Sequence, residues 1–124
     1  MKRLMTTMVV LVSGAAMAGG FELKGDAAKG EAQYKTFCVS CHGEKGDGNG
    51  PAGAALTPKP TNFTDAANAA RLTDEYTYKI IKDGGAANGR SPLMVSWSAA
   101  LKDDELRNVA AYVLKFKPAA AKKK

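Results

Sequence analysis

The sequence predicts an all-α domain in which three or more helices are joined by long loops. Three segments carry apolar residues at spacings of three and four, and helix-capping residues flank them. Loops rich in glycine and proline separate these segments, and no stretch shows the alternation of a half-buried strand. The chain has 124 residues, which suits a single domain.

Each predicted helix has its own boundary signals. The first spans residues 25 to about 37, and Asp26 is the expected N-cap because its carboxylate can accept hydrogen bonds from free amides of the first turn. The second runs from about 74 to 82 after the cap Thr73, and a glycine pair ends it. The third runs from about 103 to 116, with acidic residues at its positive N-terminal end.

The start of the chain has a composition of its own. Lys2 and Arg3 are charged, residues 4–12 are mostly apolar, and Ala-Met-Ala at 16–18 provides small residues for cleavage. This pattern is typical of a secretory signal peptide, so residues 1–18 are excluded from fold reasoning. The apolar run is short for a membrane span, which favours a cleaved leader over a stable membrane anchor. We therefore expect a periplasmic protein.

Cleavage would leave residues 19–124 as a single domain. Its core is expected at about residues 25–117, and residues 118–124 are expected to form a basic flexible tail. The formal net charge is +6, but five of the last ten residues are lysine, so the excess is concentrated at the C-terminus. No basic stripe with interleaved aromatic residues is present, so we expect no nucleic-acid partner. We expect a monomer.

A five-residue motif follows the first predicted helix: Cys38-Val39-Ser40-Cys41-His42. C-x-x-C-H is the attachment signature for c-type haem. Two thiols at this spacing can reach the two vinyl groups on one edge of the ring, and the adjacent imidazole then falls under the iron. The sequence therefore predicts one covalent haem c, held by Cys38 and Cys41 with His42 as an iron ligand. Long loops wrapped around that group would explain residues 43–72, which show no helix or strand period.

Three other interpretations of the two cysteines fit the sequence less well. A thioredoxin-like dithiol usually follows a strand in a βαβ unit, whereas here a helix precedes the motif. A structural zinc site needs four Cys or His ligands, and the chain offers only three such residues. A simple disulfide would leave His42, the only histidine in the chain, without a role.

A second iron ligand must come from another residue type, because the chain has no second histidine. Met94 is the only methionine outside the predicted signal peptide. A lone methionine more often fills a gap in a core. Met94, however, lies in a loop after Pro92 and Leu93 that could fold over the opposite haem face, and Met with His is a known ligand pair of cytochromes c. We therefore favour Met94 as the second metal ligand.

With these residues identified, the chain resembles the class I c-type cytochromes over about residues 26–116. In that family an N-terminal helix crosses the C-terminal helix through a glycine and an aromatic residue. Gly30 and Tyr34 match the first helix, and Tyr112 matches the aromatic residue of the second. The resemblance implies the small cytochrome c fold, with close packing of the two helices at Gly30.

Two further segments carry the resemblance. Residues 46–63 look like the corresponding loop of a subset of bacterial members, and by that likeness the carbonyl of Pro51 accepts the Nδ1 proton of His42 and orients the ring. Met94, followed three residues later by Trp97, resembles the family's axial methionine and its aromatic neighbour. Trp97 could pack beside a haem propionate or against the core.

Two positions depart from the family pattern. Lys102 stands where members often have Ser or Thr as the N-cap of the last helix, so Asp103 is expected to take that role. Val95 follows Met94 where related chains frequently have proline, which affects the expected path of the loop.

The resemblance implies a single-electron carrier rather than an enzyme, because iron held by both His42 and Met94 has no open site. Its partners would be redox proteins, either a membrane reductase or oxidase or a periplasmic oxidoreductase. One alternative is a haem subunit docked permanently on such an oxidoreductase. Another is a gas-binding, sensing or peroxidatic haem, if Met94 does not ligate. No second haem motif is present, which argues against a two-haem peroxidase.

Overall fold

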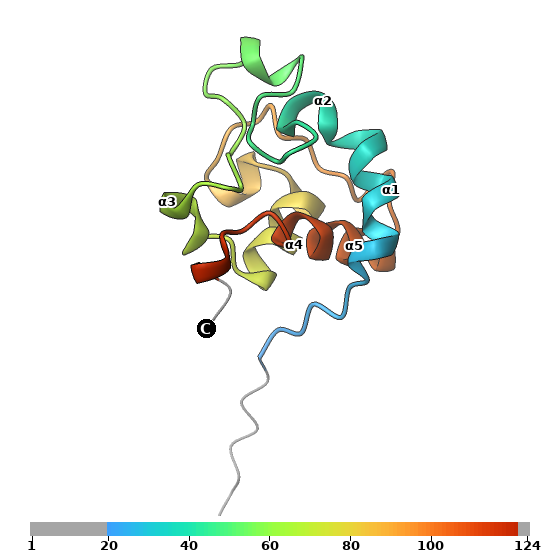
Figure 1. Ribbon diagram of the computed structural model, residues 1–124. Helices are drawn as coiled ribbons and strands as arrows, with labels where there is room; N and C mark the ends of the chain where they lie inside the picture. Colours follow the sequence, from blue (N-terminus) through green and yellow to red (C-terminus); the bar gives the residue numbers. More distant parts are fainter. Residues whose placement is uncertain (1–19, 122–124) are drawn as a thin grey trace, which may run out of the picture.

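The computed structural model describes residues 20–121 of the chain. The described residues form helices, turns and loops without a strand, which confirms the all-α prediction (Figure 1). The α-helices are α1 (Ala27–Phe37), α2 (Val39–His42), α3 (Ala66–Ala69), α4 (Asp74–Asp83) and α5 (Asp103–Leu114). Three short 3₁₀ turns are η1 (Gly53–Ala55), η2 (Ala86–Asn88) and η3 (Ala119–Ala121). The predicted signal peptide and the last three lysines lie outside the described residues.

The predicted caps of α1 and α4 are confirmed. The Asp26 carboxylate accepts hydrogen bonds from the first-turn amides of Ala28 and Lys29, at 3.0 and 3.2 Å. The Thr73 hydroxyl accepts from the amide of Tyr76 at 3.1 Å. Each side chain thereby satisfies amide groups that the helix itself leaves without partners.

The predicted cap of α5 is wrong by one residue. Lys102 is the N-cap, in an extended conformation, and Asp103 is already the first helical residue. The Glu105 carboxylate reaches back and accepts from the Lys102 amide at 2.8 Å, which is half of a capping box. Asp103 instead accepts from Arg107 Nε at 2.7 Å, one turn further along the helix. The lysine side chain has no acceptor atom for the first-turn amides. The acidic third residue of the helix therefore provides the side-chain hydrogen bond at this end of α5.

The long segment after α2 is more regular than its composition predicts. It contains η1 and α3, and the Asp65 carboxylate accepts from the Ala67 amide at 2.9 Å to begin α3. Four-residue helices are too short to produce an apolar period, which is why the sequence shows none here. The Phe63 amide donates to the Gly46 carbonyl at 2.8 Å and joins the part of this segment before η1 to the part after it.

Helix α5 packs against both α1 and α4 and supplies the centre of the core, as Figure 1 shows. Its inward stripe consists of Leu106, Val109, Ala110 and Val113, which are all buried. At the crossing with α1, a Cβ on Gly30 would lie only 1.9 Å from the Asn108 carbonyl oxygen, so the two backbones touch there. The predicted contact of Gly30 with the last helix is confirmed.

Aromatic rings extend the helix crossing toward the rest of the molecule. The Tyr34 ring lies 5.1 Å from that of Tyr112 and 5.4 Å from that of Phe116. Phe116 in turn stacks on Phe63 at 6.3 Å. The matched aromatic pair of the two helices is therefore in contact, and it is joined to the loop that follows α2.

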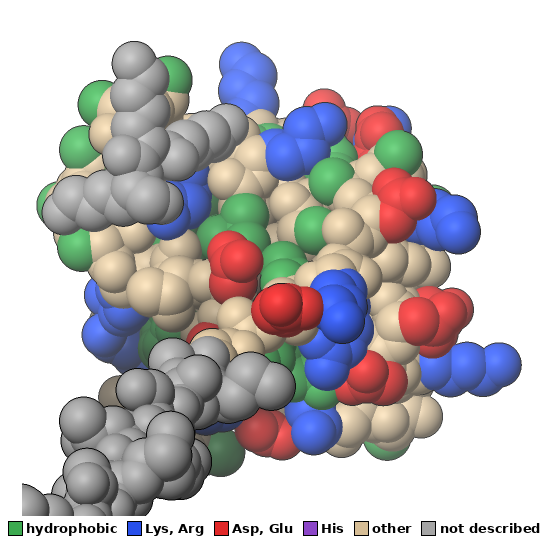
Figure 2. All heavy atoms as spheres, turned by 90° about the horizontal axis from the view of Figure 1, so that it is seen from below, with side chains coloured by type: hydrophobic (Ala, Val, Ile, Leu, Met, Phe, Trp, Pro, Cys, Tyr) green, Lys and Arg blue, Asp and Glu red, His purple; other side chains and the backbone are tan. Residues whose placement is uncertain are grey.

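The face seen in Figure 2 mixes acidic and basic side chains. Ion pairs on helix surfaces include Lys35–Glu31 at 2.6 Å and Lys79–Glu75 at 2.7 Å, both one turn apart. Such exposed pairs contribute little to stability. Within residues 20–121, none of the helices combines the length and apolar character that a bilayer crossing requires.

The close approach at Gly30 predicts that alanine at this position destabilises the protein, although alanine usually stabilises a helix. Alanine would normally stabilise an exposed helix position by about 1 kcal/mol relative to glycine. At position 30 its methyl group would meet the α5 backbone, so Gly30→Ala should lower the free energy of unfolding by about 1–3 kcal/mol. Chemical denaturation of the purified protein measures this.

Gly20→Ala is the matched control, because a Cβ at Gly20 meets nothing within 4 Å and that change should be nearly neutral. A Gly30→Ala protein as stable as wild type would contradict the helix contact.

Candidate functional site

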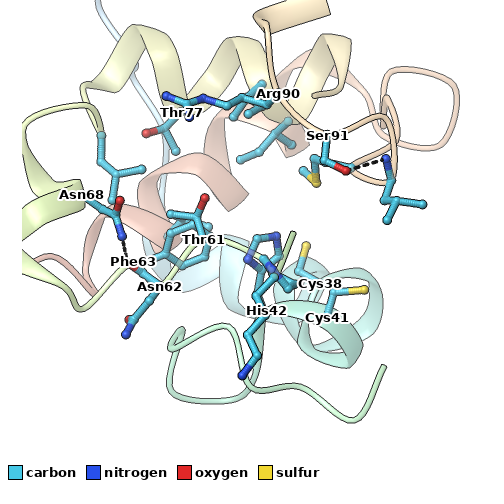
Figure 3. A pocket seen from close by; sticks show the side chains of 18 of the residues that line it. Cys38, Cys41, His42, Thr61, Asn62, Phe63, Asn68, Thr77, Arg90 and Ser91 are labelled. Atoms are coloured by element: carbon cyan, nitrogen blue, oxygen red, sulfur yellow. Dashed lines mark hydrogen bonds between the residues drawn. The ribbon is translucent and has the colours of Figure 1, made fainter. Parts of the chain in front are cut away.

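One cavity of about 450 Å³ lies between α2, α4 and the loops that flank them (Figure 3). Its volume falls within the range of small-molecule and cofactor sites. The four residues predicted from the sequence all line it: Cys38, Cys41, His42 and Met94. The fold therefore brings together a motif and a methionine that are far apart in the sequence.

The short helix α2 presents the motif to this cavity. Its turn is closed by the His42 amide, which donates to the Cys38 carbonyl at 2.9 Å. The glycine-rich loop then folds tightly over α2, because a Cβ on Gly50 would lie 2.3 Å from the Val39 carbonyl oxygen. The Gly48 amide also donates to the His42 carbonyl at 2.8 Å. The glycines of this loop thus allow the close wrapping that holds the motif in place.

Tyr34 connects the motif to the helix crossing. Its hydroxyl is buried and donates to the Gly43 carbonyl, directly after His42, at 2.6 Å. Burial raises the pKa of Tyr34 well above its usual range, so the hydroxyl remains a donor at neutral pH. One side chain of α1 therefore contacts α5 through its ring and fixes the end of α2 through its oxygen.

The imidazole of His42 is suited to bind a metal. Burial lowers its pKa, and a backbone hydrogen bond with Thr61 offsets part of that shift. The ring is therefore neutral at pH 7, as a metal ligand must be. It stacks on Phe63 with centroids 4.7 Å apart and planes 18° apart.

The predicted hydrogen bond between His42 and Pro51 is wrong for this structure. Nδ1 of His42 is buried and has no hydrogen-bond partner among the described residues. The ring of His42 stacks on Phe63, and this contact orients the ring in place of the expected hydrogen bond. The flanking amides of Gly50 and Ala52 bond instead to α2, at the Cys41 and Ser40 carbonyls.

The two thiols differ from those of a dithiol redox site. Burial raises the pKa of the Cys38 thiol to about 12, and the nearby Cys41 adds to the effect. Reactive cysteines of the thioredoxin type have a lowered pKa, because the thiolate is the nucleophile. A helix, α1, precedes the motif rather than a strand. Both observations disfavour thiol–disulfide exchange at this site.

Met94 reaches the cavity from the loop between α4 and α5. The Gly85 amide donates to its carbonyl at 2.7 Å, and the Met94 amide donates to the Ser91 carbonyl at 3.2 Å. Its neighbours Leu93 and Val95 are 55 and 52% exposed, whereas Met94 is partly buried and packs against the core. The loop thus turns the methionine inward between two exposed apolar residues.

Trp97 lies on the rim of the same cavity. Its ring packs against Phe37 with centroids 5.3 Å apart, and its amide donates to the Ile81 carbonyl at 3.0 Å. The contact with Phe37 places it against α1. It joins the loop that carries Met94 to the first helix.

Sequence reasoning missed the polar side of the cavity. Figure 3 shows Cys38 and Cys41 on one side of His42 and a group of polar residues on the other. That group comprises Thr61, Asn62, Asn68 and Thr77, all of which line the cavity. Arg71 lines the cavity as well. No motif marks these residues, and only the folded chain brings them together.

The residues present fit a haem c. The cavity is large enough, both thiols and the neutral imidazole lie on one wall, and the polar atoms on the opposite side include a buried Thr77 hydroxyl without a hydrogen-bond partner. Cys38 and Cys41 would hold the group, and His42 and Met94 would face its iron.

Comparison with known proteins also identifies this chain as a c-type cytochrome. The family model for cytochrome c matches residues 27–117. Cytochrome c-554(548) of Halomonas halodenitrificans is 33% identical over 88 residues, which cover 71% of this chain and 93% of that protein. The Cbb3-type cytochrome c oxidase subunit CcoP of an Azospirillum species is 31% identical over 93 residues, which cover 72% of this chain but only 28% of that subunit.

A solved structure shares the fold. A chain of the Kuenenia stuttgartiensis reducing HAO-like protein complex superposes with a TM-score of 0.65 at 27% identity, over 85% of this chain and 48% of that one. The family match includes both helices of the Gly30 crossing and the whole C-x-x-C-H motif. The chain therefore belongs to the cytochrome c family, whose electron-transfer proteins carry covalently bound haem c.

Proposed function

We propose that this cytochrome c is a periplasmic single-electron carrier with one haem c, in which His42 and Met94 are the axial ligands. The observation that carries the proposal is the convergence of Cys38, Cys41, His42 and Met94 on one cavity. The periplasmic location rests on the signal-peptide pattern of residues 1–18.

Each residue has a distinct role in this proposal. Cys38 and Cys41 form thioether bonds, so that the cofactor cannot dissociate. His42 provides a neutral nitrogen, because burial disfavours its protonated form. Met94 provides a soft thioether sulfur, which favours the ferrous state and raises the reduction potential. When bound, the haem supplies an iron that alternates between its ferric and ferrous states.

The protein's contribution to electron transfer is to keep this site rigid and dry. The core residues Leu72, Ile81 and Val113 are buried and line the cavity, which limits access of water to the iron. A surrounding of low polarity disfavours the extra charge of the ferric form. Leu93 and Val95 line the cavity and are exposed on either side of Met94, so a partner could contact them.

Two observations favour a second possibility, a haem subunit docked on a larger oxidoreductase. The relatives include a CcoP oxidase subunit and a chain of a reducing HAO-like complex, of which this chain spans only 28% and 48%. Affinity purification under native conditions distinguishes the two. A free carrier elutes as a single chain, whereas a docked subunit co-purifies with a larger redox protein in a fixed ratio.

Covalent attachment of one haem is the first prediction of this proposal. The intact mass of the periplasmic protein should equal residues 19–124 plus one haem, because both thiols add to vinyl groups without loss of atoms. Acid-acetone treatment should leave the colour on the protein. Haem that extracts into the solvent, or a mass without it, would exclude the attachment. The same mass tests cleavage after Ala18.

Ligation by Met94 is the second prediction. Met94→Ala should open one face of the iron, so that the reduced protein binds CO and the reduction potential falls. Optical spectra with and without CO, and a potentiometric titration, measure both effects. If Met94 only fills the core, the variant loses stability but has the same spectrum, CO binding and reduction potential as the wild type.

Leu93→Ala is the matched control for this variant. Leu93 lines the same cavity in the same loop, but it is 55% exposed and has no donor atom for iron. It should retain the wild-type spectrum and potential and remain closed to CO.

A further inference from the structure

The loop that carries Met94 is fastened to the C-terminal end of α4. Ser96 Oγ donates to the Lys82 carbonyl at 2.6 Å, and the Trp97 amide donates to the Ile81 carbonyl at 3.0 Å. The last carbonyls of a helix have no amide partner within it, so this loop supplies donors that α4 lacks. The segment directly after the methionine is therefore bound to α4 at two points.

Gly85, just after α4, holds the methionine itself and the turn before it. Its amide donates to the Met94 carbonyl at 2.7 Å, and its carbonyl accepts from the Arg90 amide at 2.8 Å. A Cβ on Gly85 would lie 2.0 Å from the Ser91 carbonyl oxygen and 3.2 Å from Met94 Cβ. The backbone of Gly85 is right-handed, with φ −66° and ψ −45°, so the close approach rather than the backbone conformation requires glycine here.

The turn before Met94 depends on that close approach. The Ser91 carbonyl, against which Gly85 packs, accepts a hydrogen bond from the Met94 amide at 3.2 Å. Met94 is partly buried, and Ile80 and Ile81 of α4 line the same cavity as its side chain. The position of the methionine in the cavity is therefore set by the contacts of its loop with α4 and Gly85.

We propose that Gly85 and Ser96 are positioning residues, which hold the Met94 sulfur against the iron and so close that face of the haem to small molecules. This inference rests on the proposed function, because it requires Met94 as an axial ligand. A small molecule such as imidazole binds this iron through its nitrogen only after the bond between iron and the Met94 sulfur has broken, and no electron is transferred in this exchange. Its apparent affinity is therefore the intrinsic affinity reduced by the fraction of molecules in which the loop has moved away.

The contacts with α4 and Gly85 keep that fraction small. Loss of one hydrogen bond changes an equilibrium by about two- to tenfold, so Ser96→Ala should raise the apparent affinity for imidazole by about that factor. Gly85→Ala should raise it by at least about fivefold, because its methyl group overlaps the Ser91 carbonyl and displaces the turn before Met94. The same contacts distinguish an electron carrier from a haem that binds small ligands.

The test titrates the purified ferric haem protein with imidazole and follows the optical spectrum. Ferric iron bonded to a methionine sulfur has a weak absorption band at the red end of the visible spectrum, which reports the Met94 bond directly. Both variants should lose this band at lower imidazole concentrations than the wild type. Ser96 is exposed, so Ser96→Ala keeps the test decisive if Gly85→Ala does not fold.

Two changes in the same region are the matched controls. Ser98→Ala removes an exposed hydroxyl that lies 2.9 Å from Ser96 Oγ and bonds within the loop. Gly89→Asn adds a side chain where a Cβ meets nothing within 4 Å, and asparagine tolerates the left-handed conformation of this residue. Both controls should bind imidazole as the wild type does.

Wild-type imidazole affinity in both Gly85→Ala and Ser96→Ala, with haem attached and the methionine band present, overturns this inference and leaves Met94 as the ligand. A lower stability at unchanged imidazole affinity is the result expected of a purely structural role. Equal gains in affinity in the two controls overturn the inference as well, because the loop would then respond to any change. A wild-type protein without the methionine band overturns ligation by Met94 and this inference together.

Discussion

The contact between the backbones of α1 and α5 at Gly30 is the constraint on which the rest of the structure depends. A Cβ there would lie 1.9 Å from the Asn108 carbonyl oxygen, so only glycine allows the helices to approach this closely. This approach lets Tyr34 meet Tyr112 and Phe116 at ring distances near 5 Å. A domain of this size has a small core, and one tight helix crossing organises much of it.

The same crossing controls the site through Tyr34. Its ring belongs to the helix contact, and its hydroxyl holds the Gly43 carbonyl at the end of the C-x-x-C-H turn. Phe63 completes the link on the other side, because it stacks on both Phe116 and His42. A change in the angle between the helices would therefore move the imidazole, so the packing of α1 against α5 sets the position of the His42 ring.

From the sequence, the haem-binding motif and the helix caps are easier to predict than the structure of the loops. Asp26 and Thr73 are caps because their side chains act locally, and C-x-x-C-H specifies its function within five residues. The Lys102 cap was missed because the hydrogen bond at this end of α5 comes from the Glu105 side chain in the first turn and not from the cap residue. The polar wall of the cavity was missed for a different reason: residues such as Thr61, Asn68 and Thr77 form no motif, and only tertiary packing brings them to the cavity.

We propose that this fold encloses a single iron, ligated on both sides, that passes one electron at a time. A potentiometric titration of the wild-type protein, followed optically and repeated under CO, tests it most directly. We expect one reversible one-electron transition per chain, with the same spectrum and midpoint potential in the presence of CO. Rapid CO binding by the reduced protein, or more than one transition per chain, would contradict it.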